Sequence, residues 1–300
     1  MHSLKKFGCL VAGRHCDTGN CGLNPTCAAA VLFGALIGLG RACFPRPKAG
    51  VGCGKYKKVE RDVFSFEHLE ILNDADVTGG ADLTVVLTKD KGPLYWDVDK
   101  CWLETYLRLD AKNDAAQSKL KIRLASTFAN RLSCPLDKYC SNYVTVPIDL
   151  LKSLKVSKNV KVHADASIKN IEKIEVSDAD VSLNIFWSNE LEVKAKLGAN
   201  VNLEGRVKAL AVETSDDAGE ARPKETGLKG GRVMAKALKA DDTIVTPAAG
   251  VSFVQVCGKL TVQTPTASSG LVYFTGDAVG AVESSTVRRL KGKNPCKTKK

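Results

Sequence analysis

Residues 160–169 alternate strictly between apolar and polar side chains, and this pattern constrains the fold more than any other feature of the chain. The segment reads Val-Lys-Val-His-Ala-Asp-Ala-Ser-Ile-Lys, with every even position apolar. Because successive side chains of a β-strand point to opposite faces, such a segment has one dry face and one solvated face. The pattern recurs over most of the chain from about residue 63 onward. The sequence therefore predicts an all-β body.

Short strands separated by Gly, Pro and Asp are typical of antiparallel sandwiches, so we expect an antiparallel sandwich or a jelly-roll-like body. One segment, 146–154, favours a short helix, because Pro147 suits a first helical position and Ile148, Leu151 and Leu154 share a helical face. Residues 72–77 also resemble residues 176–181, which would be consistent with a duplication, but a match this short also arises by chance.

Composition divides the chain into three parts. Residues 1–57 form a Cys-rich N-terminal arm, residues 58–287 form the β-rich body, and residues 288–300 form a basic tail. Within the body, residues 213–231 are polar and rich in Gly, Glu and Lys, which is typical of a long loop or of a joint between two subdomains.

The arm contains an apolar run, 27–40, of fourteen residues without a charge. As a helix it would cover about 21 Å, which is short of the roughly 30 Å hydrocarbon core of a bilayer. A membrane anchor, a buried core helix and a signal peptide all remain open. Basic residues flank the run, so a spanning segment would place the body on the cytoplasmic side, with reduced cysteines there and oxidised ones in the arm.

Eleven cysteines are present, six of them within the first 53 residues. Their spacings do not match the paired C-x2-C motifs of common zinc sites, which favours disulfides or free thiols. The disulfide candidates are Cys9, Cys16, Cys21, Cys27, Cys134 and Cys140.

The net charge of +11 is concentrated at the C-terminus, where seven basic residues occur without an acidic one. Such a segment either serves solubility alone or contacts a polyanion such as nucleic acid or acidic lipid. The candidate polyanion contacts are Arg288, Arg289, Lys291, Lys293, Lys297, Lys299 and Lys300.

Pairs of aspartates near strand ends are the remaining candidates for chemistry. Asp74, Asp76, Asp97 and Asp99 would be calcium ligands if their loops converge, since calcium takes six to eight oxygen atoms. Residues 69–87 resemble the opening of a C2 domain, but Leu83 follows Asp82 where that family has an Asp-Pro pair. The alternative for these aspartates is hydrogen bonding to their own turns.

The sequence contains neither a G-x-S-x-G nor an H-E-x-x-H motif, and it indicates no catalytic residues and no cofactor. We therefore expect a non-enzymatic structural subunit, such as a viral coat or minor capsid protein, located in a virion or at a membrane. Its partners would be other protein subunits, including copies of itself, with membrane contact through residues 27–40. The alternatives are a C2-like calcium- and phospholipid-binding module and a clamp-like nucleic-acid accessory protein.

Overall fold

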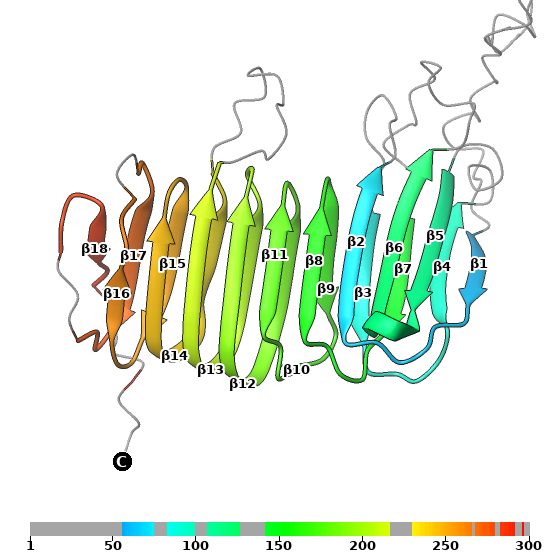
Figure 1. The fold of residues 1–300 in the computed structure, drawn as a ribbon, viewed down its shortest axis with the longest axis horizontal. Helices are drawn as coiled ribbons and strands as arrows, with labels where there is room; N and C mark the ends of the chain where they lie inside the picture. The colour runs from blue at the N-terminus through cyan, green and yellow to red at the C-terminus, as the bar shows by residue number, and fades with distance from the viewer. Residues whose placement is uncertain are drawn as a thin grey trace, which may run out of the picture.

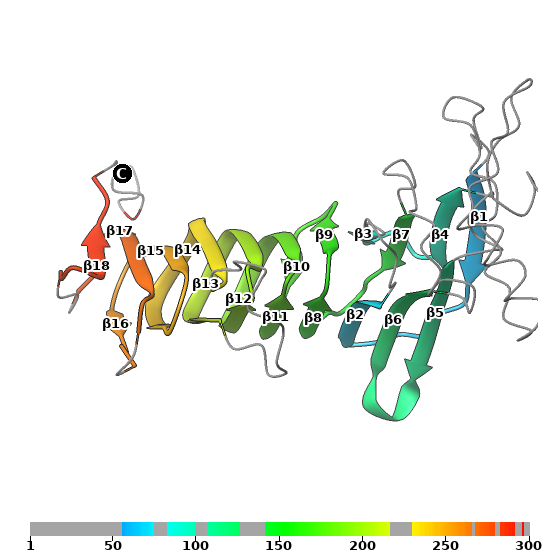
Figure 2. The same cartoon turned by 90° about the horizontal axis from the view of Figure 1, so that it is seen from above.

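The computed structural model describes residues 56–74, 83–99, 107–126, 142–216, 230–265, 268–279, 283–291 and 296. Its strands lie side by side along one long axis, from β1 at one end to β18 at the other (Figure 1). Seen from above, they form two layers that face each other (Figure 2). The apolar half of each alternating strand points between the layers, where it forms one continuous core.

Six shorter strands belong to the first layer: β5 (Leu107–Asp114), β6 (Lys119–Ser126), β2 (His68–Asp74), β8 (Ser153–Ser157), β11 (Lys173–Ser177) and β16 (Leu260–Val262). Eight belong to the second layer: β1 (Tyr56–Arg61), β4 (Leu94–Asp99), β7 (Asn142–Pro147), β3 (Leu83–Thr88), β9 (Val160–Ala164), β15 (Val251–Val256), β17 (Leu271–Gly276) and β18 (Val287–Arg289). Three long strands bend from the second layer into the first: β12 (Asp180–Lys196), β13 (Asn200–Ser215) and β14 (Arg232–Pro247). The two-residue β10 (Ile168–Lys169) pairs with β12 at its bend, and a 3₁₀ turn, Ala115–Gln117, joins β5 to β6.

The chain winds as a coil in which each turn contributes one strand to each layer. Successive strands of the second layer begin at Val160, Asp180 and Asn200, so these turns of the coil are 20 residues apart. Neighbouring turns pair in parallel, as β11 does with both β8 and β12. Parallel pairing requires a crossover between partners, and here the crossover is the strand in the opposite layer.

The predicted all-β body is confirmed, but the predicted antiparallel pairing is wrong for most of the described chain. Within the described residues, only the β1–β4, β4–β7 and β5–β6 ladders are antiparallel. The pattern of alternation is the same for both pairing directions, so it could not separate a sandwich of hairpins from a parallel coil.

The helix predicted for 146–154 is also wrong, because its backbone hydrogen bonds go to distant segments of the chain. The N–H of Ile148 donates to the carbonyl of Thr88, and the N–H of Lys152 donates to that of Glu67. Ile148, Leu151 and Leu154 are nevertheless buried. Their spacing reports burial correctly, although the segment that connects β7 to β8 is not helical.

Residues 213–231 join two strands that are direct neighbours. β13 and β14 pair from Asn200↔Arg232 to Thr214↔Pro247, with one register shift, so the two strands are neighbours in one sheet although this segment separates them in the chain. At the bend of β13, Gly205 has a φ of +114°, and a Cβ there would lie 1.7 Å from the carbonyl oxygen of Ile185. Only glycine permits this close approach of β13 to the bend of β12.

Candidate functional site

The outer face of the first layer carries a row of alternating charges. One side chain from each of six neighbouring strands, β6, β2, β8, β11, β12 and β13, lies in this row in register. The alternating row consists of Lys121, Glu70, Lys155, Glu175, Lys194 and Glu213. Opposite charges directly across a strand pair stabilise a sheet, whereas like charges destabilise it. The row therefore neutralises its own charge.

Ion pairs hold both ends of the alternating row. Glu70 accepts from Lys119 at 2.5 Å and from Lys121 at 3.2 Å, and Lys194 contacts Glu213 at 2.9 Å and Glu192 at 3.0 Å. Burial alone would raise the pKa of Glu70, but the hydrogen bonds and charges of its two lysines lower that pKa overall. The hydrogen bonds to Glu213 and Glu192 raise the pKa of Lys194.

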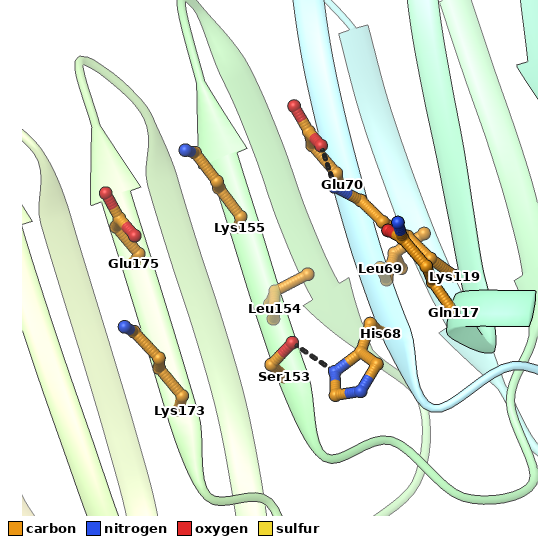
Figure 3. Close-up of a pocket in the computed structure, with 10 residues that line it drawn as sticks. All are labelled: His68, Leu69, Glu70, Gln117, Lys119, Ser153, Leu154, Lys155, Lys173 and Glu175. Carbon is orange, nitrogen blue, oxygen red and sulfur yellow. Dashed lines mark hydrogen bonds and ion pairs between the residues drawn. The ribbon is translucent and has the colours of Figure 1, made fainter. Parts of the chain in front are cut away.

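A depression of about 390 Å³ lies over β2, β8 and β11, and Glu70, Lys155 and Glu175 of the alternating row line it (Figure 3). Nδ1 of His68 lies 2.8 Å from Oγ of Ser153 at one end, and Lys155, Lys173 and Glu175 line the other. The close His–Ser pair arises because the two residues are in register on neighbouring parallel strands.

The His68–Ser153 pair has the residue types of a base and a nucleophile, but the surrounding groups do not complete an acyl-transfer site. Among the described residues, no carboxylate is hydrogen-bonded to His68. The strand N–H groups beside it lie in the plane of the sheet and donate to neighbouring strands, so they are not available as oxyanion donors. The depression instead offers hydroxyl, imidazole, ammonium and carboxylate groups for contacting a polar ligand.

The candidate calcium ligands lie in different layers. Asp74 ends β2 in the first layer, where Oδ2 accepts from Nε of Arg123 at 2.8 Å and Oδ1 from Nζ of Lys158 at 2.7 Å. Asp97 and Asp99 lie on β4 in the second layer, and Asp76 is outside the described residues. Burial raises the pKa of Asp74, but Lys158 and Arg123 more than offset this and lower it. No cluster of three or more potential metal ligands occurs in the described part of the chain.

The structure contains a disulfide that sequence reasoning missed. Cys257, directly after β15, is bonded to Cys296 near the C-terminus, with the two Cα atoms 5.3 Å apart. Reduced cysteines were expected in the body only if residues 27–40 span a membrane, and this bond between two cysteines of the C-terminal part does not fit that arrangement. No spacing rule connects two cysteines 39 positions apart, so the sequence held no signal for this pair. All six predicted disulfide cysteines lie outside the described residues.

The predicted polyanion contacts begin within the sheet. Arg288 and Arg289 belong to β18, which pairs in parallel with β17, and Lys291 follows the strand. One guanidinium nitrogen of Arg289 donates to the carbonyl of Gly276 at 2.6 Å, and the same guanidinium lies 5.9 Å from the Phe274 ring centroid. Lys293, Lys297, Lys299 and Lys300 lie outside the described residues.

Membrane contact was predicted for residues 27–40, which the structure does not describe. Among the helices of the described part of the chain, none is long and apolar enough to cross a membrane.

Comparisons with known proteins give one family and a set of similar folds. Residues 108–278 match the family described as "Putative auto-transporter adhesin, head GIN domain". A search of curated proteins found no match. A solved putative adhesin from Bacteroides fragilis is 14% identical, with a TM-score of 0.53 over 78% of this chain and 97% of its own. At this identity the likeness shows a shared fold.

Two further solved structures resemble the chain less closely. A putative lipid binding protein from Parabacteroides distasonis is 14% identical, with a TM-score of 0.44 over 79% of this chain and 93% of its own. A putative adhesin from Parabacteroides merdae is 16% identical, with a TM-score of 0.38 over 79% of this chain and 92% of its own.

Proposed function

The chain belongs to the family of putative auto-transporter adhesin head GIN domains, and from this premise we propose that it is a non-enzymatic, surface-exposed or membrane-associated attachment domain. Its parallel coil would present the outer faces of both layers to an extended ligand.

Family membership corrects the expectation of a viral coat or minor capsid protein. The matching family and the similar folds are putative adhesins and a putative lipid binding protein from bacteria, and none is a capsid protein. The two alternatives, a C2-like calcium- and phospholipid-binding module and a clamp-like nucleic-acid accessory protein, receive no support from these matches either.

The observation that carries the proposal is that the family match coincides with the coil. Residues 108–278 include the strands from β5 to β17. Over this span, parallel register places equivalent side chains of successive turns in straight rows across the sheet. A rigid, flat array of exposed side chains lets many weak contacts act together without an ordering cost on the protein side.

Surface exposure and attachment can be tested on the full chain in its native cells. We expect protease added to intact cells to cleave the protein, and we expect purified protein coated on beads to retain the beads on a matrix of cell-surface polymers. A tagged cytoplasmic protein and beads coated with albumin are the controls. Protection of the chain until the cells are lysed, together with no bead retention, would refute the proposal.

A further inference from the structure

A stacked aromatic row lies on the outer face of the second layer, at the C-terminal end of the coil. Met234 of β14, Phe253 of β15, Tyr273 of β17 and Arg288 of β18 are in register across these four parallel strands. The rings of Phe253 and Tyr273 stack with their centroids 4.9 Å apart and 14° between their planes. This spacing equals the distance between neighbouring strands, so the row is built into the coil.

Cationic residues flank the stack on both sides. Nζ of Lys236 lies 4.3 Å and the guanidinium carbon of Arg232 lies 5.7 Å from the Phe253 ring centroid, and on the other side Arg288 of β18 is in register with Tyr273. We call Arg232, Lys236 and Arg288, with the two rings between them, the cationic row. Cation–π contacts orient the ammonium and guanidinium groups, which lowers the entropy they lose on binding a ligand.

The cationic row differs from the alternating row of the first layer because its charges are not neutralised. Strands β15, β17 and β18 and the segment 232–240 of β14 contain no Asp or Glu. Within the described part of the chain, Arg232, Lys236 and Arg288 make no ion pair with a carboxylate, and all three are exposed. An excess of oriented positive charge on a flat face favours an anionic partner.

We propose that the cationic row binds an acidic polysaccharide that lies across the strands, parallel to the long axis of the coil. Three strand spacings separate β14 from β18, or about 14 Å, so one extended chain bearing sulfate or carboxylate groups can contact both cationic ends. Arginine suits this role, since its guanidinium binds such anions through two parallel hydrogen bonds. The inference rests on the proposed attachment function and names the ligand class for it.

The geometry favours a polysaccharide over the other polyanions. Single-stranded nucleic acid binds through stacking of its bases on open ring faces. Tyr273 covers one face of Phe253, and Arg232 and Lys236 also lie against the Phe253 ring. Membrane insertion needs apolar side chains that project from the surface, whereas Phe253 and Tyr273 are half-buried within their row. Charged groups on a sugar chain need only the exposed cations.

The test compares dextran sulfate with neutral dextran, because the two share a backbone and differ in charge. We expect the full chain to bind dextran sulfate in a salt-sensitive manner and to ignore dextran. The triple variant Arg232→Gln, Lys236→Gln, Arg288→Gln should bind about tenfold more weakly or worse, since each lost contact weakens the electrostatic attraction. The variant Arg232→Lys, Arg288→Lys should bind with an affinity between those of the wild type and the triple variant, because lysine keeps the charge but cannot form the two parallel hydrogen bonds of a guanidinium.

Matched variants separate the cationic row from net charge. Lys112→Gln, Lys169→Gln, Lys208→Gln removes the same charge from exposed positions on other strands and should bind normally. A second control replaces Lys293, Lys297, Lys299 and Lys300 with Gln. Equal loss in the row variant and the first control, or loss only in the second, would overturn the proposal. So would tighter binding to phosphatidylserine vesicles or single-stranded DNA than to dextran sulfate.

The two proposals fail separately. The fold of the triple variant is checked by its circular-dichroism spectrum and melting temperature. If beads coated with the folded variant are still retained, the attachment function is supported and the proposed role of the cationic row is refuted. Row-dependent binding of dextran sulfate by a chain that intact cells keep from protease would support the row and refute surface attachment. If the triple variant does not fold, the same comparisons use the single variants Arg232→Gln and Arg288→Gln.

Discussion

Replacing Ile174 with alanine tests whether the core is a column of in-register side chains from successive turns of the coil. Ile174 on β11 is fully buried. It pairs with Leu154 of β8 on one side and Val193 of β12 on the other. The substitution removes three carbon atoms from the middle of this column, where neither neighbour can move without disturbing its own turn.

The expected cost follows from the lost burial and the cavity. Three carbons at about 0.8 kcal/mol each give roughly 2.5 kcal/mol of lost transfer free energy. The residual cavity adds to this, so the free energy of unfolding should fall by about 3–4 kcal/mol, within the range known for Ile→Ala in cores. The neighbouring Glu175 points outward, and Glu175→Gln should cost no more than about 0.5 kcal/mol.

Denaturant unfolding followed by circular dichroism measures the global effect, and amide hydrogen exchange measures its location. Because each turn contacts mainly its neighbours, loss of protection should concentrate in β8, β11 and the second half of β12. A change below about 1 kcal/mol for Ile174→Ala, or an equal cost for Glu175→Gln, would refute the assignment of the inward face. Protection lost evenly over the chain would refute the stacked-turn argument.

Three further predictions follow from the geometry. The pKa of Asp74 lies below its ordinary value of 3.8, so its stabilisation is present above about pH 4 and is lost as the pH falls through the folded-state pKa; Asp74→Asn should flatten the acid limb of a stability–pH curve. Cys257→Ala opens a disulfide with a sequence separation of 39, and loop entropy predicts a loss of about 4 kcal/mol, measured by denaturant unfolding; an unchanged midpoint would contradict this. Lys155→Cys with Glu175→Cys should oxidise to a disulfide detectable by mass spectrometry, because the two positions lie side by side in register on neighbouring strands, and failure to do so would argue against parallel pairing of β8 and β11.

Part of the candidate site could be read from the sequence, but its assembly could not. Alternation correctly places Glu175 on a solvated face, whereas Lys155 directly follows the segment 146–154 for which a helix was predicted. It gives no reason to put them beside each other, because they are 20 positions apart and no short motif joins them. The same holds for Phe253 and Tyr273, which become a stacked pair only when two turns of the coil are in register.

The candidate calcium ligands also show that the sequence does not reveal which strands are neighbours. In the sequence, Asp74 and Asp97 share only their position near strand ends. Convergence of strand ends depends on which strands are neighbours, and β2 and β4 belong to opposite layers. The carboxylate of Asp74 is instead held by Arg123 and Lys158, cations from strands or turns adjacent to β2.

By itself the sequence determined that the body is all-β and which side chains of β9, β11 and β12 face inward, because these depend on local alternation and on the avoidance of water by apolar groups. Only the tertiary structure decided that the strands pair in parallel at 20-residue intervals, that Cys257 meets Cys296, that charges alternate across the first layer, and that Arg232, Lys236 and Arg288 gather at the C-terminal end of the second. These features depend on the register between segments that are distant in the chain. Local alternation does not specify that register, which is set only when the strands pair in the folded coil.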